Sequence, residues 1–274
     1  MADWLAWAAR ELRACGDDAR LEAEVLLGHL LACNRAGLVV RADDALDAHT
    51  ALRYAALVER RVRGEPVAYL TGQREFWSLP LQVSPAVLIP RPDTELLVEW
   101  ALQRLRGIDT PVIADLGTGS GAIALALASE LPQARVVATD ASEAALEQAR
   151  HNAAVLGLQR VEFRPGDWFE PLAEERFDLI LSNPPYVADA DPHLAELRYE
   201  PRRALVAGAD GLDALRRIAA GARAHLRPRG ALLLEHGSGQ GEAVRELLRE
   251  HGFDAVETRR DLAGHERASG GEAA

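Results

Sequence analysis

The feature that most constrains the fold is an alternation of short apolar runs, turns and amphipathic stretches that begins near residue 111. Six apolar runs that are followed by turn residues are predicted to be strands: 111–117, 135–140, 160–167, 177–183, 230–237 and 253–259. Apolar residues at helical spacing predict helices at 121–131, 142–157, 211–226 and 241–252. Strands that alternate with helices form a parallel sheet with helices on both faces. The sequence therefore predicts a doubly wound α/β domain over residues 93–274.

The first 73 residues have a helical pattern throughout. Asp17 or Asp18 is the predicted N-cap of one helical stretch, and Asn34 with Gly37 supplies its stop. Short helices of this kind are stable only when they pack on each other or on a partner. We therefore predict a small helical domain, residues 1–73, which carries no cofactor motif and serves to recognise a partner.

Residues 74–92 show period-two alternation interrupted by four prolines. This pattern predicts a β-hairpin linker with Pro85 near its turn. A helix is predicted to begin after the linker, capped by Asp93 or Thr94. At the other end of the domain, residues 266–274 are polar and are predicted to be frayed.

The charged and sulfur-containing residues exclude several classes of protein. All 31 basic residues are arginine, which excludes Schiff-base lysine chemistry and a P-loop lysine. The formal net charge of −11 argues against stable binding of long DNA through counterion release. Two cysteines, Cys15 and Cys33, are too few for a disulfide framework, and the histidines lack metal-ligand spacing, so we expect no metal.

The chain also lacks the sequence signals of membrane insertion and export. No stretch approaches the roughly 18 consecutive apolar residues of a membrane span. The first 18 residues lack a basic region followed by an apolar one. We expect a cytoplasmic monomer that does not bind membranes.

A glycine-rich loop ends the first predicted strand and opens the next helix. Its residues are Gly117, Thr118, Gly119, Ser120 and Gly121. Glycines permit a tight turn and close approach of a ligand, and the helix N-terminus offers free N–H groups. Asp140 ends the second strand, where a carboxylate can bind both hydroxyls of a ribose. The loop also fits the dinucleotide pattern G-x-G-x-x-A, so by itself it favours S-adenosylmethionine and a nicotinamide or flavin dinucleotide about equally. A purely structural glycine turn is a third interpretation.

The third strand ends at Gly166-Asp167-Trp168. The acid can accept a hydrogen bond from an adenine amino group, and the face of Trp168 can pack on the ring. The alternative interpretation is a turn followed by a core tryptophan.

The motif Asn183-Pro184-Pro185-Tyr186 follows the fourth strand, at the edge of the sheet where ligands bind. Two prolines stiffen the backbone and remove two N–H donors. The side-chain oxygen of Asn183 and the carbonyl of Pro184 can then accept both hydrogens of a planar NH₂ group, while Tyr186 offers a flat surface. Such acceptors position a weakly nucleophilic nitrogen towards an electrophile, here the methyl group of a sulfonium, without a strong base.

Together these segments resemble the protein-(glutamine-N5) methyltransferases that modify peptide chain release factors. The resemblance extends over nearly the whole chain. It is carried by 64–72, 89–95, the glycine-rich loop, Asp140, Gly166-Asp167-Trp168, Asn183-Pro184-Pro185-Tyr186, Tyr199-Glu200-Pro201 with Ala204-Leu205, and 208–212. It implies a Rossmann-like class I methyltransferase sheet with a small N-terminal helical domain and a β-hairpin linker.

The resemblance also implies an activity and a set of roles. It implies methyl transfer from S-adenosyl-L-methionine to the N5 amide of the glutamine in the release factor's Gly-Gly-Gln motif. The residues that would bind the cofactor are Gly117, Thr118, Gly119, Ser120, Gly121, Asp140, Trp168 and Asn183. Asn183, Pro184, Pro185 and Tyr186 would hold the substrate amide, with Asn183 and Pro184 as the catalytic residues. The helical domain would bind the release factor, and the loop at Tyr199-Glu200-Pro201 would lie next to the active site.

Three alternatives and one departure remain. A cofactor-binding adaptor without catalytic activity would be expected to have lost Asn183, which is present. A ribosomal-protein glutamine methyltransferase shares the catalytic motifs but differs in its N-terminal region. A nucleic-acid amino methyltransferase would need a basic groove or a target-recognition insertion, and neither is present. The departure is at residues 264–271, which are polar where the family has an apolar final strand, so the sequence leaves a seventh strand open.

Overall fold

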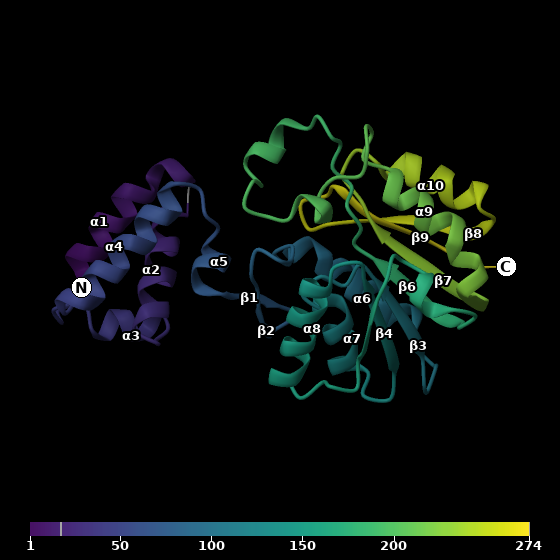
Figure 1. Ribbon diagram of the computed structural model, residues 1–274, viewed down its shortest axis with the longest axis horizontal. Helices are drawn as coiled ribbons and strands as arrows, with labels where there is room; N and C mark the ends of the chain where they lie inside the picture. Colours follow the sequence, from purple (N-terminus) through teal and green to yellow (C-terminus); the bar gives the residue numbers. More distant parts are fainter. Residues whose placement is uncertain (17, 274) are drawn as a thin grey trace. The chain divides into compact units, whose positions relative to one another are not determined.

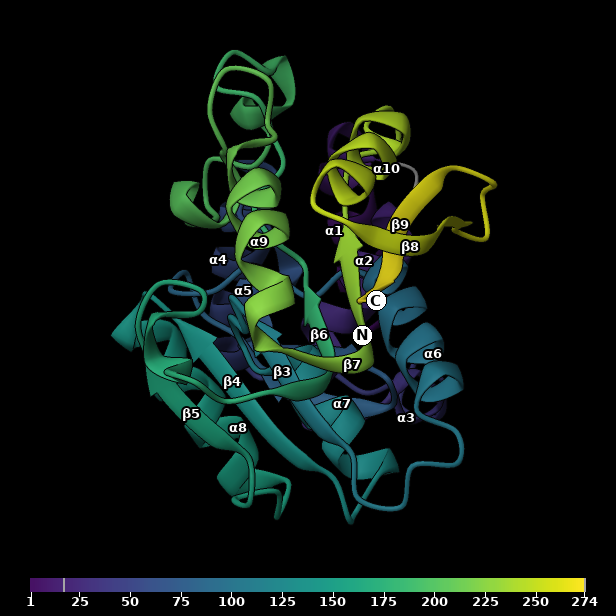
Figure 2. The same cartoon turned by 90° about the vertical axis from the view of Figure 1, so that its right-hand side faces the viewer.

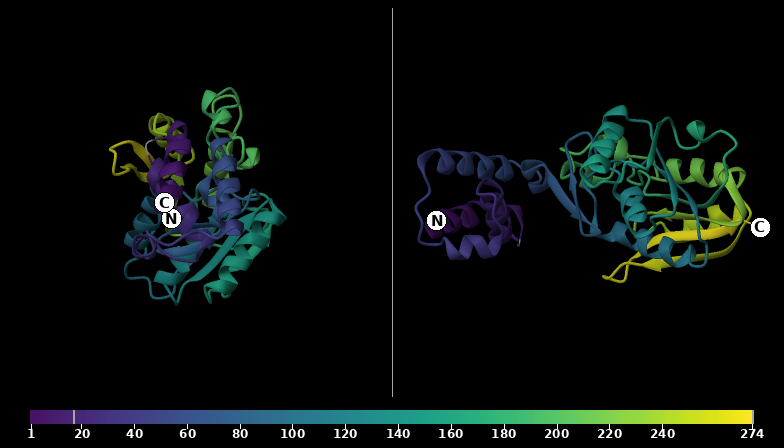
Figure 3. Two further views of the ribbon diagram at one scale, coloured as in Figure 1. Left: turned by 90° about the vertical axis from the view of Figure 1, so that its left-hand side faces the viewer. Right: turned by 90° about the horizontal axis from the view of Figure 1, so that it is seen from below.

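The computed structural model describes residues 1–16 and 18–273. The chain forms two compact units, Met1–Gln73 and Arg74–Ala274, each with its own core. The helices of the first unit are α1 (Ala2–Glu11), α2 (Ala19–Leu30), α3 (Arg35–Val40), α4 (Ala48–Val62) and α5 (Val67–Thr71). Helix α2 packs against each of the other four, as Figures 1 and 3 show for the purple and blue helices.

The capping of the N-terminal helices differs in part from the prediction. Asp18 occupies the N-cap position of α2, but its side chain accepts no helix N–H, and Asp17 lies outside the described residues. Asn34 begins α3 instead of supplying a stop, because its side-chain oxygen accepts the N–H of Gly37 at 3.0 Å. Asparagine favours this N-cap geometry.

A two-stranded hairpin opens the second unit. Strands β1 (Gln73–Phe76) and β2 (Leu79–Gln82) pair with each other. Their turn lies at Trp77 and Ser78, which both have positive φ, so the prediction of a turn near Pro85 was wrong. Two left-handed residues make the tight turn that matches the twist of paired strands. Phe76 is buried in the core of the second unit, so the hairpin belongs to that unit.

A seven-stranded sheet forms the body of the second unit, with the order β5-β4-β3-β6-β7-β9-β8. Its strands are β3 (Val112–Leu116), β4 (Arg135–Asp140), β5 (Glu162–Pro165), β6 (Phe177–Ser182), β7 (Leu226–Glu235), β8 (Phe253–Arg260) and β9 (Glu266–Ala273). The first five strands in that order are parallel, and β9 runs antiparallel to both neighbours. This is the predicted doubly wound α/β fold.

Helices cover both faces of the sheet (Figure 2). They are α6 (Glu95–Arg104), α7 (Ala122–Glu130), α8 (Glu143–Val155), α9 (Asp213–Ala222) and α10 (Gly241–Glu250). Successive strand residues alternate between two cores: Leu233 packs with α6 and α7, and its neighbour Leu232 packs with α9 and α10. This alternation is the period of two that a sheet buried on both faces requires.

Strand β9 overturns the prediction of a frayed C-terminal segment. It lies inside the sheet between β7 and β8, and its residues 268–271 are buried. A Cβ atom on Gly270 would lie 2.5 Å from Leu233 Cδ2 and 2.7 Å from the carbonyl oxygen of Leu232. Small residues are needed here because the sheet and Trp100 leave no room for larger side chains. Since the strand therefore lacks large apolar side chains, its sequence resembles that of a frayed terminal segment.

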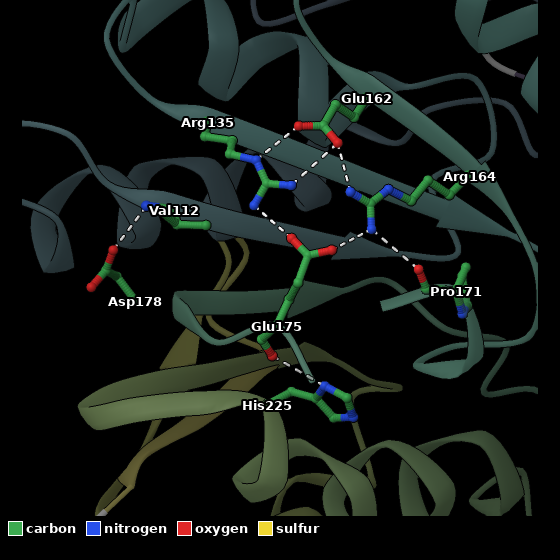
Figure 4. Close-up of polar contacts among 8 residues, drawn as sticks. All are labelled: Val112, Arg135, Glu162, Arg164, Pro171, Glu175, Asp178 and His225. Atoms are coloured by element: carbon green, nitrogen blue, oxygen red, sulfur yellow. Dashed lines mark hydrogen bonds and ion pairs between the residues drawn. The ribbon is translucent and has the colours of Figure 1, made fainter. Parts of the chain in front are cut away.

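Charged side chains hold the segment after β5 against the sheet edge (Figure 4). Arg135 pairs with Glu162 at 2.8 Å and with Glu175 at 2.6 Å. Arg164 pairs with the same two carboxylates. Charges at an edge strand oppose pairing with another chain. The same network fixes the ends of the segment 166–175, which contains Trp168.

Candidate functional site

The carboxyl ends of β3, β4 and β6 surround a cavity of about 220 Å³. Most of the predicted site residues line it: Gly117, Thr118, Gly119, Ser120, Asp140, Trp168, Asn183 and Pro185. A second cavity of about 160 Å³ is lined by Asn183, Pro184 and Tyr186 together with Arg91 and Leu197. Asn183 thus lines both cavities. Gly121 lines neither, and instead occupies the N-cap position of α7 with a φ of 85°.

Backbone hydrogen bonds hold the glycine-rich loop against strand β4. Gly117 and Thr118 donate their N–H groups to the carbonyl oxygen of Thr139, at 2.8 and 2.9 Å. Gly119 has a φ of 56°, and an added Cβ would have no atom within 4 Å. Glycine is therefore favoured here by the left-handed backbone conformation and not by crowding, and the space beside it is open. Non-glycine residues rarely adopt this region. The loop therefore presents a backbone surface to the cavity.

Both carboxylate oxygens of Asp140 can accept further hydrogen bonds. Its Oδ2 accepts the N–H of Gly119 at 2.9 Å, and its Oδ1 accepts that of Ser142 at 2.8 Å. Burial raises the pKa of the Asp140 carboxyl, and these N–H groups and the positive charge of Arg203 oppose the shift. A carboxylate oxygen has capacity beyond one bond, so both oxygens can still accept hydroxyl protons from a ribose.

Asp115 is a buried acid beneath the loop, and the sequence motifs give it no role. The hydroxyl of Thr118 donates to its Oδ2 at 2.6 Å, so Thr118 has no free donor for a ligand. Asp115 Oδ1 has no hydrogen-bond partner among residues 1–16 and 18–273. Burial raises the pKa of Asp115 to about 6. Its part is to shape the loop from below.

Trp168 forms a wall of the first cavity. Its φ is 50°, and its carbonyl accepts the hydroxyl of Thr139 at 3.0 Å. Its ring lies against Gly117, where an added Cβ would come within 3.2 Å. The buried indole N–H has no partner in the described part of the chain. Glycine at 117 is thus required by the close approach of the tryptophan as well as by its φ.

Asn183 is oriented by a residue 89 positions earlier in the chain. Its Nδ2 donates to the hydroxyl oxygen of Thr94 at 3.0 Å. Because the nitrogen is engaged, Oδ1 is turned away from Thr94. Tyr186 is fixed on the same turn: its hydroxyl donates to Glu235 Oε1 at 3.3 Å, and its carbonyl accepts Nε2 of Gln240 at 3.1 Å.

Sequence reasoning missed Glu235, and it placed Glu200 only as part of the loop that the resemblance puts next to the active site. Glu235 ends β7, and its side chain is buried under Asn183-Pro184-Pro185-Tyr186. Glu200 accepts the N–H of Ile89 at 3.1 Å and pairs with Arg91 at 2.5 Å, which ties two loops that border the cavities. Glu235 could have been singled out from the sequence, because it is an acid that directly follows the apolar run of a predicted strand. No local pattern joins Glu200 to Ile89.

Among residues 1–16 and 18–273, no group of three or more histidine, cysteine, aspartate or glutamate side chains could hold a metal ion. Within the same described part of the chain, no helix has both the length and the apolar character needed to span a membrane.

The chain matches two families and several curated relatives. Residues 3–72 match the family described as "PrmC N-terminal domain", and residues 92–199 match "Methyltransferase small domain". Proteins named "Release factor glutamine methyltransferase" are 58% identical in Xylella fastidiosa (92% of each chain) and 54% identical in Burkholderia pseudomallei (97% of this chain, 96% of that one). A third, from Vibrio cholerae, is 49% identical over 97% of this chain and 94% of its own.

Solved structures share the fold at lower identity. A methyltransferase from Pyrococcus furiosus has a TM-score of 0.55 at 22% identity, covering 71% of this chain and 89% of its own. A 16S rRNA N2 G1207 methyltransferase from T. thermophilus, solved with AdoMet and guanosine, has a TM-score of 0.56 at 24% identity, covering 74% of this chain and 50% of its own.

Proposed function

The chain belongs to the family of release factor glutamine methyltransferases, and from that premise we propose that Asn183 and Pro184 hold the reacting amide of the substrate. The enzyme transfers a methyl group from S-adenosyl-L-methionine to a glutamine of peptide chain release factors. The proposed target within them is the glutamine of the Gly-Gly-Gln motif, and the second cavity is the proposed site for its side chain.

The observation that carries this assignment is the hydrogen bond from Asn183 to Thr94. This bond supports the assignment, since it engages Nδ2 of Asn183 and leaves Oδ1 to accept a substrate N–H. The carbonyl of Pro184 is the second acceptor, on a turn where prolines supply no competing N–H. Two acceptors on one NH₂ group hold its plane and its lone pair in a defined direction.

The chemistry requires these acceptors more than it requires a base. S-adenosylmethionine supplies a methyl group bonded to a positively charged sulfur. An amide nitrogen is a weak nucleophile because its lone pair is delocalised. Hydrogen-bond acceptors favour a pyramidal nitrogen and stabilise the positive charge that develops on it. The nitrogen becomes acidic once it is alkylated, so its proton can then leave to solvent.

The residues that line the first cavity support its assignment to the cofactor. Asp140 retains hydrogen-bonding capacity suited to a ribose diol, and the glycine-rich loop leaves open space beside it. Apolar side chains such as Val87, Leu88 and Ile123 line the remaining wall, which suits an adenine ring. We assign cofactor binding to Gly117, Thr118, Gly119, Ser120, Asp140, Trp168 and Asn183, which line this cavity. Gly121 lines neither cavity, and its proposed part is to begin α7 behind the loop.

The partner assignments complete the proposal. The N-terminal unit binds the release factor away from the reacting glutamine. The enzyme acts as a cytoplasmic monomer and does not bind DNA stably, in keeping with a net charge of −11.

Substitution of Asn183 tests the proposal. Asn183→Ala removes a preorganised acceptor and should lower the rate of methylation by about 10²–10³. Asn183→Asp keeps the shape and an acceptor, and should retain more activity than the alanine variant. The measurement is transfer of labelled methyl to purified release factor, with a ribosomal protein and DNA assayed in parallel. If Asn183→Ala is folded, binds cofactor and methylates at the wild-type rate, the turn has only a structural role and the proposal is wrong.

A further inference from the structure

Two segments of the chain that are distant in sequence line both cavities. One is residues 86–94, which precede α6, and the other is residues 197–205, which lie in the loop after β6. Leu88 in the first segment and Ala204 in the second each line the two cavities at once. The position of these segments relative to each other therefore sets the shape of both cavities.

The side chain of Glu200 joins the two segments. It is 3% exposed, so its charge is almost wholly removed from water. Its Oε2 accepts the N–H of Ile89 at 3.1 Å, and its Oε1 accepts Nη2 of Arg91 at 2.5 Å. A buried carboxylate is costly unless it is paired and hydrogen-bonded, and here both oxygens are engaged by residues 86–94. Separation of the segments would leave this buried charge without these partners.

The segment that the carboxylate binds is stiff. Pro90 and Pro92 flank Arg91, and proline fixes its own φ and restricts the residue before it. Arg91 is extended, with a φ of −96° and a ψ of 144°. Thr94, two residues after Pro92, accepts the Nδ2 hydrogen bond of Asn183 at 3.0 Å. A displacement at Arg91 is therefore carried along the segment towards Asn183.

We propose that Glu200 is a positioning residue that holds residues 86–94 against residues 197–205 and so keeps the cofactor cavity and the substrate cavity in their binding shapes. This inference rests on the proposed assignment of the two cavities. Glu200 lines neither cavity, and Arg91 lines only the second one. An effect of both side chains on cofactor affinity therefore has to act through the position of the segments.

The first experiment measures the Kd for S-adenosylmethionine by calorimetry in Glu200→Gln and Arg91→Gln. Each substitution breaks the ion pair between the segments, so affinity should fall at least about fivefold in both. A direct Coulomb effect on the positively charged cofactor would have opposite signs in the two variants, because one loses a negative charge and the other a positive one. Glu196→Gln, at an exposed acid of the same loop, is the matched control and should keep the wild-type affinity.

The double variant measures whether the two side chains act as one unit. Once the ion pair is broken, removal of its second partner breaks no further bond between the segments. Glu200→Gln combined with Arg91→Gln should therefore bind the cofactor within about twofold of the weaker single variant. The kcat/KM for release factor at saturating cofactor should also fall in both single variants, because the same segments line the second cavity.

Circular dichroism should first establish that the variants fold. If Glu200→Gln does not fold, Arg91→Gln decides the matter, because the Arg91 side chain is 34% exposed and its replacement leaves the bond from Ile89 to Glu200 in place. Wild-type cofactor affinity in a folded single variant, opposite shifts in the two, additive losses in the double variant or an unchanged kcat/KM would overturn the inference.

Asp140→Ala separates this failure from a failure of the proposed function. If Asp140→Ala also binds S-adenosylmethionine with wild-type affinity, the assignment of the first cavity to the cofactor has failed. If Asp140→Ala binds it weakly while Glu200→Gln and Arg91→Gln bind it normally, only the role of Glu200 has failed.

Discussion

At the scale of single residues, several polar side chains of the site already form hydrogen bonds within the protein. Thr118 gives its hydroxyl to Asp115, Asn183 gives its amide nitrogen to Thr94, and Asp140 accepts two backbone N–H groups. Each of these bonds removes a freedom that a ligand would otherwise have to restrict. Preorganisation of this kind lowers the entropic cost of binding and of reaching the transition state.

Asp140 provides the test of cofactor binding at this scale. Asp140→Ala removes a charged acceptor for two hydroxyl groups, and hydrogen bonds to charged groups contribute about 1.5–3 kcal/mol each. We expect calorimetry to show affinity for S-adenosylmethionine at least about tenfold weaker. The same substitution leaves the N–H groups of Gly119 and Ser142 without their partner, so folding should be checked by circular dichroism. Unchanged affinity would place the ribose elsewhere.

The motif residues were accessible from the sequence because each motif is local. The glycine-rich loop, Asp140 and Asn183 follow their strands directly, and parallel strands bring their carboxyl ends to one edge. Thr94 and Glu235 were not accessible, because Thr94 meets Asn183 across 89 residues and Glu235 meets Tyr186 across 49 residues from another strand. Only the packed fold brings these residues together.

At the scale of elements, β9 shows how a core strand can look like a disordered tail. Sequence patterns identify buried strands by their apolar side chains. In β9 the core contribution comes from Ala268, Ser269 and two glycines, because Leu233 and Trp100 fill the space that larger side chains would occupy. Composition alone cannot distinguish such a strand from a flexible segment.

Substitution of Gly270 tests this explanation. A Cβ atom would lie within 3.0 Å of three atoms, one of them a backbone oxygen, so Gly270→Ala should lower the free energy of unfolding by about 2–3 kcal/mol. Gly239→Ala is the matched control, since nothing lies within 4 Å of its added Cβ. Urea denaturation of both variants provides the comparison. Equal stability of the two would show that β9 has room for side chains.

At the scale of the whole molecule, the proposed function assigns recognition and chemistry to different units. The unit Met1–Gln73 contains none of the cavity-lining residues, and the unit Arg74–Ala274 contains all of them. Each unit buries its own apolar cluster. The second unit therefore contains every residue that lines the two cavities, and we assign recognition of the protein substrate to the first unit.

A chain that starts at Gln73 tests this division and keeps β1 complete. It should bind S-adenosylmethionine within about threefold of the full chain, because every cavity residue is retained. Its kcat/KM on intact release factor should fall at least about tenfold, because the contacts of the first unit are lost. Circular dichroism should first establish that the shortened chain folds. Full efficiency on the intact protein would refute a recognition role for the helices.

The position of β9 also has a consequence for how the chain acquires its fold. Strand β8 is synthesised before β9, yet its neighbour in the sheet is β9 and not β7. Until β9 emerges from the ribosome, β8 has no strand to pair with, and β7 exposes a long unpaired edge. Nascent chains of this enzyme should therefore depend on residues 266–273 to complete the sheet, and a ribosome that stalls before these residues would leave an aggregation-prone intermediate.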